Sequence, residues 1–70
     1  MYFFASAIII YEREKNEELQ YIKSNKSIKF ILDHYPSKLQ IENMFDHEQV
    51  LKIDIMCVQE WSQEQYDAYE

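Results

Sequence analysis

The chain has 70 residues, no glycine, one cysteine and a formal net charge of −6. This length allows one compact core, so we expect a single domain over residues 1–70. Hydrophobic residues make up 47% of the chain and aromatic residues 16%, which excludes an intrinsically disordered protein. The lack of glycine excludes Rossmann and P-loop nucleotide sites, because their backbone must approach a pyrophosphate closely.

A chain this short buries only about 60% of its unfolded surface, so it needs further stabilisation. One cysteine cannot form an intrachain disulfide, and no Cys/His set has zinc-binding spacing. Self-association is the remaining common device, and we therefore expect a homodimer. The unpaired cysteine is consistent with a cytoplasmic location, which would be the host cytoplasm for a viral protein.

The apolar stretch over residues 1–11 lacks the features of a signal peptide or a membrane span. No basic residue precedes it, no small-residue cleavage site follows it, and its length is about half the roughly 20 residues of a spanning helix. We therefore expect no membrane partner. Its β-branched and aromatic side chains predict a strand over residues 2–11, buried on both faces and central in its sheet.

Two helices are predicted next. Asn16 can cap a helix over residues 16–25, and Asn25 can end it. A second helix over residues 27–34 would stop before Pro36. It is predicted from apolar residues at i, i+3, i+4 and i+7, namely Ile28, Ile31, Leu32 and Tyr35.

The remaining segments predict an edge strand over residues 38–42, a turn over 43–48 and a strand over 50–58. A short terminal helix begins at Ser62, since Ser62 and Gln65 have capping-box spacing. The fold class is therefore α+β: a three-stranded antiparallel sheet with one or two helices on one face and a short C-terminal helix. If the helices form one crossover, the third strand lies between the first two.

An enzymatic site would have to use Cys57 as a nucleophile with His34 or His47 as its base. Cys57 lies between Met56 and Val58 in a predicted core strand, where an apolar setting favours an inert thiol. No pair of carboxylates is singled out for acid–base work either. We therefore expect no catalytic residue, no cofactor and no enzymatic activity.

A metal site could combine Asp46, His47 and Glu48 with Glu42 or His34. Because their spacing matches no recognised metal-binding loop, we expect a solvated polar turn and no bound metal.

A basic stretch contains Lys23, Lys26 and Lys29. Direct nucleic-acid binding requires a net basic face, which the net charge of the chain argues against. We therefore expect these lysines to lie on a solvated helix face.

Negative charge is concentrated in the second half of the chain. Residues 41–70 contain eight acids and one lysine, whereas residues 1–40 contain five acids and six bases. If residues 60–70 were helical, Glu60, Glu64 and Asp67 would share one face, with Trp61 and Tyr69 opposite.

Two interpretations of this segment are open. Trp61 and Tyr69 could pack on the protein's own sheet and leave the acids merely solvated. Alternatively, acids and aromatics form a surface that binds a basic or nucleic-acid-binding protein. The second interpretation predicts a non-enzymatic inhibitor or modulator of a host protein, of phage or mobile-element type, including mimics of DNA charge. Its binding residues would be Asp46, Glu48, Glu60, Trp61, Glu64, Asp67 and Tyr69.

A different class of function is a small accessory or assembly subunit of a larger complex. Such a subunit would bind through apolar contacts and an added edge strand, with little dependence on salt.

Overall fold

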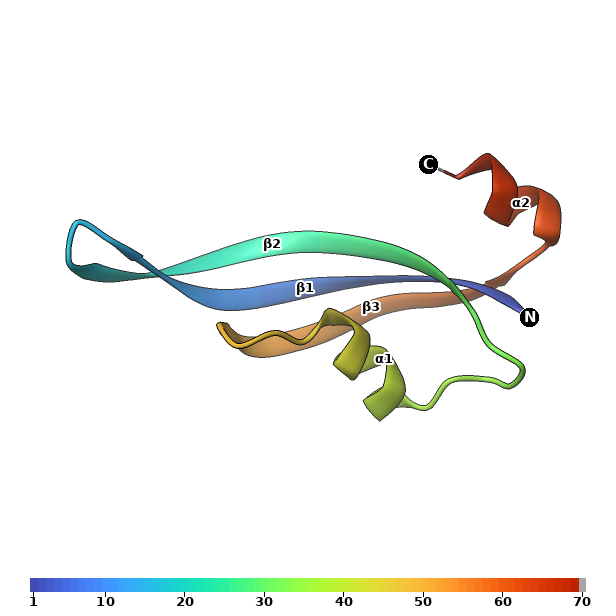
Figure 1. Ribbon diagram of the computed structural model, residues 1–70, viewed down its shortest axis with the longest axis horizontal. Coiled ribbons are helices and arrows are strands. Elements are labelled where there is room, and N and C mark those ends of the chain that lie inside the picture. The colour runs from blue at the N-terminus through green and yellow to red at the C-terminus, as the bar shows by residue number, and fades with distance from the viewer. Residues whose placement is uncertain (70) are drawn as a thin grey trace.

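The computed structural model describes residues 1–69, which form a three-stranded antiparallel sheet with two short helices (Figure 1). The strand order is β2-β1-β3. This confirms the α+β class, with one short helix between strands and a second at the C-terminus. The elements are β1 (Tyr2–Lys15), β2 (Glu18–Ile31), α1 (Lys38–Phe45), β3 (Val50–Trp61) and α2 (Gln63–Ala68).

β1 is the central strand, as its sequence predicted. Successive side chains of a strand point to opposite faces, and in β1 the odd-numbered residues from Phe3 to Ile9 are at most 3% exposed. The even-numbered residues of the same stretch are half-buried. Burial on both faces was therefore a wrong expectation, because α1 covers only the odd-numbered face.

β2 replaces the two helices predicted over residues 16–25 and 27–34. A two-residue turn at Asn16 and Glu17, with φ of 55° and 65°, reverses the chain, as in a type I′ hairpin. From there β2 pairs with β1 without a break, from Lys15↔Glu18 to Tyr2↔Ile31. Strand pairing prevailed over the helical spacing of apolar residues, because it satisfies the backbone groups that β1 and β2 direct toward each other.

α1 lies where an edge strand over residues 38–42 was predicted. The Ser37 hydroxyl accepts a hydrogen bond from the Gln40 amide at 3.2 Å, and the Gln40 Oε1 accepts one from the Ser37 amide at 2.8 Å. Ile41 and Phe45, one turn apart, are both buried. The helix continues to Phe45, so the turn predicted over 43–48 begins only at Asp46.

The core lies between α1 and the odd-numbered face of the sheet. Ala5 and Ala7 are small, which leaves room for the helical side chains over the middle of β1. The buried cluster consists of Ala5, Ala7, Ile9, Ile41 and Phe45. Half-buried residues packed around it are Tyr11, Ile28, Phe30, Val50, Ile53 and Ile55.

β3 confirms the strand predicted over residues 50–58 and extends it to Trp61. Ser62 and Gln65 form the predicted capping box at the start of α2. The expected order, with the third strand between the first two, applied only to a helical crossover. The structure has β2 in place of that crossover, and β1 lies between β2 and β3. Neither helix within residues 1–69 is long and apolar enough to cross a membrane.

Candidate functional site

Charge is separated between the two edges of the sheet. β2 carries three lysines and no acid from Leu19 to Ile31, whereas residues 32–69 carry eight acids and two lysines. The three lysines lie on β2, an outer strand, whereas the acids lie on β3, on the two helices and in the loops beside them. We define the acidic side as these eight residues: Asp33, Glu42, Asp46, Glu48, Asp54, Glu60, Glu64 and Asp67. All but the half-buried Glu42 are exposed.

The predicted binding residues lie in two groups at opposite ends of β3. Asp46 and Glu48 lie in the loop that leads into Val50, while the others follow from Glu60 onwards. β3 pairs with β1 from Tyr11 to Tyr2, so its two ends are about 30 Å apart at most. The structure therefore does not bring the two groups together in one compact site.

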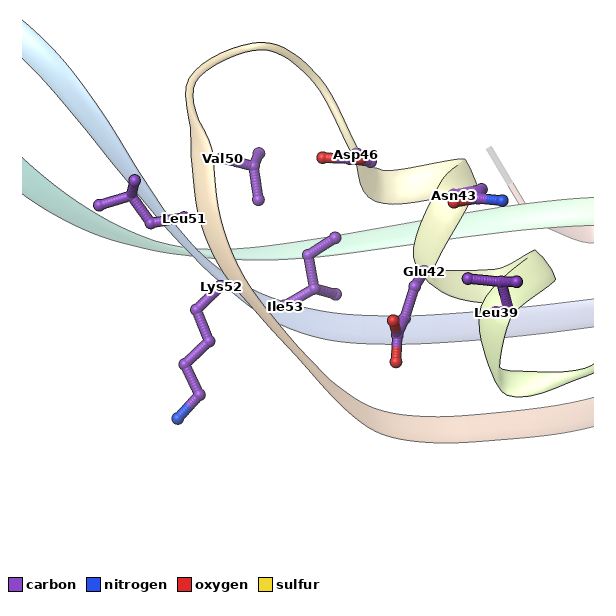
Figure 2. Close-up of a pocket in the computed structure, with 8 residues that line it drawn as sticks. All are labelled: Leu39, Glu42, Asn43, Asp46, Val50, Leu51, Lys52 and Ile53. Atoms are coloured by element: carbon purple, nitrogen blue, oxygen red, sulfur yellow. The ribbon is translucent and has the colours of Figure 1, made fainter.

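Asp46 lines an open groove of about 310 Å³ between α1 and the start of β3. Figure 2 shows Asp46 and Glu42 on the helix side, with Val50 and Ile53 facing them from the strand. The other lining residues are Leu39, Asn43, Leu51 and Lys52. Carboxylates beside aliphatic side chains suit a lysine or arginine, which has an apolar stem and a cationic head.

Trp61 and Tyr69 pack on the protein's own sheet. The Trp61 ring stacks on Phe4 with centroids 4.7 Å apart and an interplanar angle of 3°. Tyr69 meets Phe4 edge-on at 5.5 Å and Trp61 at 5.4 Å. Both predicted aromatics therefore belong to a C-terminal aromatic cluster, which consists of Tyr2, Phe4, Trp61, Tyr66 and Tyr69.

Lys29 of β2 holds α2 in place through hydrogen bonds. This contact was not predicted from the sequence. Its Nζ donates hydrogen bonds to the backbone oxygens of Tyr66 and Tyr69, both at 2.8 Å, and lies 4.3 Å from the Tyr66 ring centroid. A cation at this position satisfies carbonyls at a helix C-terminus. Lys29 is therefore part of the C-terminal structure, and its predicted place on a solvated helix face was wrong.

Glu60, Glu64 and Asp67 do not share a helix face. Glu60 belongs to β3 and is paired with Phe3, which places it on the face that α1 covers. There its carboxylate raises the pKa of the Tyr35 phenol. Glu64 and Asp67 lie on α2, where both are exposed, so these two form the remaining acidic pair at this end.

The candidate nucleophile and bases lie in different settings. Cys57 is half-buried on β3 and is paired with Ser6 of β1. The Nδ1 of His34 lies 2.6 Å from Asp33 Oδ1, and this hydrogen bond raises the pKa of His34 and lowers that of Asp33. His47 packs edge-on against Tyr11, with ring centroids 6.1 Å apart.

The residues weighed as metal ligands do not form a ligand cluster. Within residues 1–69, His, Cys, Asp and Glu side chains gather nowhere in a group of three or more that could hold a metal ion. Asp46 follows α1 as its C-cap, and the His47 ring is turned toward Tyr11.

Comparisons with protein-family models, with curated proteins and with solved structures found no match for this chain. Function must therefore be inferred from the surface itself. Its distinguishing properties are the acidic side, the groove beside Asp46 and a rigidly docked α2.

Proposed function

We propose that this protein is a non-enzymatic, acidic binding protein that occupies a basic, nucleic-acid-binding surface of another protein. The observation that carries the proposal is the uneven charge, with eight acids in residues 32–69 against three lysines and no acid in β2 from Leu19 to Ile31. A negative surface steers association with a basic partner and rejects other acidic molecules. Inhibitors of phage or mobile-element type, including DNA mimics, act in this way.

The two acidic groups lie far enough apart to suit an extended partner. Asp46 and Glu48 lie at one end of β3, whereas Glu64 and Asp67 lie on α2, which follows the other end. β3 pairs with β1 from Tyr11 to Tyr2, so its two ends are about 30 Å apart at most. A basic groove that follows a nucleic-acid backbone over a similar length would meet both groups.

The docked α2 also supports the proposal. The stacked Trp61 and the Lys29 hydrogen bonds hold the helix on the sheet, so Glu64 and Asp67 are presented in a defined position. A preorganised surface loses less conformational entropy on binding. Tyr69, which is 37% exposed, can contribute contact area beside these acids.

The test is affinity capture from a host lysate with the tagged protein, eluted stepwise with salt. We expect a basic or nucleic-acid-binding protein to elute at moderate salt, since exposed charges are screened beyond about 10 Å at 0.1 M. The double variant Glu64→Lys/Asp67→Lys should reduce recovery of that protein at least tenfold.

The matched control is Glu14→Lys/Glu17→Lys, which makes the same charge change at the β1–β2 hairpin, away from the acidic side. It should leave recovery within twofold of the unmodified protein. Equal recovery with both double variants would refute the proposal, because net charge and not this surface would then govern binding.

A second candidate function is an accessory or assembly subunit that adds an edge strand to a larger complex. The exposed outer edge of β2, with Tyr21 68% and Leu19 64% exposed, favours it. Here the captured partner should stay bound at high salt, because backbone hydrogen bonds and apolar contacts dominate. The salt step at which the partner elutes therefore separates the two functions.

A further inference from the structure

β2 offers a long and regular free edge. Its pairing with β1 is unbroken, whereas β3 shifts register with β1 at two places. Bulges of this kind protect an edge strand from further pairing. β2 contains neither a bulge nor a proline, so it is the edge of this sheet that can accept another strand.

The direction of the backbone groups on β2 follows from the hydrogen bonds between Met1 and Leu32, the pair just beyond the end of β2. Met1 and Leu32 exchange two hydrogen bonds, of 2.8 Å and 3.1 Å. Because hydrogen-bonded and non-hydrogen-bonded pairs alternate in an antiparallel ladder, even-numbered residues of β2 direct their N–H and C=O groups toward β1. The odd-numbered residues from Leu19 to Ile31 therefore direct theirs outward, to the free edge.

The hydrophobic core is incompletely covered along β2. α1 packs over β1 and β3, and the side chains of Ile22, Ile28 and Phe30 on the same face of β2 are only half-buried. An open groove of about 390 Å³ runs there, lined on its apolar part by Ile9, Tyr11, Ile28, Met44 and Phe45. A neighbouring strand with apolar residues on this face would extend the core across β2.

A second copy of β2 has both a free edge and apolar residues on the α1 face. In a symmetric antiparallel pair the two residue numbers in each pair have a constant sum. Outward-facing residues must meet outward-facing ones, so the two-fold axis passes through a residue and not between two. An axis at Lys23 or at Lys26 places identical lysines face to face, which is unfavourable. An axis at Ser24 places Ile22 opposite Lys26.

An axis at Asn25 is the favourable solution. It places Ile22 opposite Ile28 on the α1 face and Leu19 opposite Ile31 on the other. Leu19 and Ile31 are 64% and 57% exposed in the single chain. Each lysine then faces an uncharged residue: Lys23 faces Ser27, Lys26 faces Ser24 and Lys29 faces Tyr21. Axes at residues further from the centre of β2 shorten the paired segment.

We propose that this protein forms a homodimer through antiparallel pairing of β2 with β2, with Asn25 opposite Asn25. The product is a continuous six-stranded sheet of order β3-β1-β2-β2-β1-β3. Both α1 helices lie on the same face, and the two β3 strands form the outer edges of the sheet. This inference goes beyond the proposed function and does not depend on it.

The first measurement is the molar mass in solution by sedimentation or light scattering. A mass of twice the 8.6 kDa of one chain is expected. Asn25→Pro removes an outward-facing N–H without touching the bonds to β1, so it should weaken the dimer at least tenfold while the far-ultraviolet circular dichroism is retained. A monomer at all concentrations up to the millimolar range would overturn the proposal.

Crosslinking tests the register and uses no variant that breaks the sheet. In a Cys57→Ser background, Asn25→Cys should form a symmetric disulfide, since paired Cα atoms about 5.5 Å apart lie within disulfide range. Ser27→Cys is the matched control, on the same strand and face. Its two copies would be four residues out of register, about 13 Å apart.

Mild oxidation should therefore give a covalent dimer with Asn25→Cys at least tenfold faster than with Ser27→Cys. Equal rates, or faster crosslinking of Ser27→Cys, would show another interface or register and overturn the proposal. A β2 edge that pairs with a different protein would leave the purified chain monomeric, which also contradicts it.

Discussion

At the scale of single residues, Glu17 has an unfavourable backbone conformation. It lies in the hairpin turn with φ of 65°, next to Asn16 with φ of 55°. Asn tolerates this left-handed region, but a residue with a long side chain pays about 1 kcal/mol for the contact between its Cβ and the backbone. The hydrogen bonds and side-chain contacts of the long β1–β2 ladder offset this cost and hold the turn in place.

Glu17→Gly should therefore stabilise the protein. Asn-Gly is the preferred sequence of a type I′ turn, and we expect the free energy of unfolding to rise by about 0.5–1 kcal/mol. Urea denaturation at a fixed protein concentration measures it. The control Glu17→Ala removes the charge and keeps the Cβ, so a similar gain there would attribute the effect to charge and contradict this explanation.

At the scale of elements, α2 is too short to be stable by itself and depends on the sheet. It has six residues, none of them buried, and its capping box satisfies only its first turn. Isolated helices shorter than about 12 residues are marginal in water. Lys29 and the C-terminal aromatic cluster therefore hold it in place.

Lys29→Met should loosen α2, because it keeps an unbranched apolar side chain and removes the ammonium group that binds two carbonyl oxygens. We expect faster amide exchange in α2, a shift of Trp61 fluorescence and a loss of about 1 kcal/mol in stability. Lys23→Met, on the same strand and face, is the control. Unchanged exchange in α2 after Lys29→Met would mean that aromatic stacking alone holds the helix.

At the scale of the whole molecule, the chain is elongated and its core is small. Its radius of gyration is 14.3 Å, with extents of 46 × 24 × 16 Å, whereas a compact domain of this length has about 11 Å. Its accessible surface is 5324 Å², against about 4700 Å² for a typical monomer of this mass. The chain therefore buries less surface than a compact domain of the same size.

The small core makes every buried residue matter. Ile41 is 4% exposed, and Ile41→Ala should lower the free energy of unfolding by about 2–4 kcal/mol. That is a large part of the total stability of so short a chain, about 4–10 kcal/mol. Leu39→Ala on the same helix, where Leu39 is 66% exposed, should cost less than about 0.5 kcal/mol in the same urea titration.

Similar losses from Ile41→Ala and Leu39→Ala would contradict the assignment of the core to one face of α1. Both variants must be compared at the same protein concentration, because self-association adds to the stability of the folded state.

Several features of this fold can be predicted from local sequence. The apolar run at residues 2–11 indicated the central strand, and alternation indicated the strand over 50–58. The capping box at Ser62 and Gln65 correctly predicted the start of α2. The same Ser-x-x-Gln spacing at Ser37 and Gln40 indicates α1, although the alternation over residues 38–42 led to a strand prediction there.

The tertiary structure alone decided β2 and the layout of the acidic side. The hydrogen bonds of β2 come from β1, up to about 30 residues away, and its turn has no glycine to reveal it. Helical spacing over residues 28–35 could therefore not be told from a strand. The acids after residue 41 were recognisable from composition, but only folding separates them along β3. Charge is a property of residues, whereas distance depends on how strands pair.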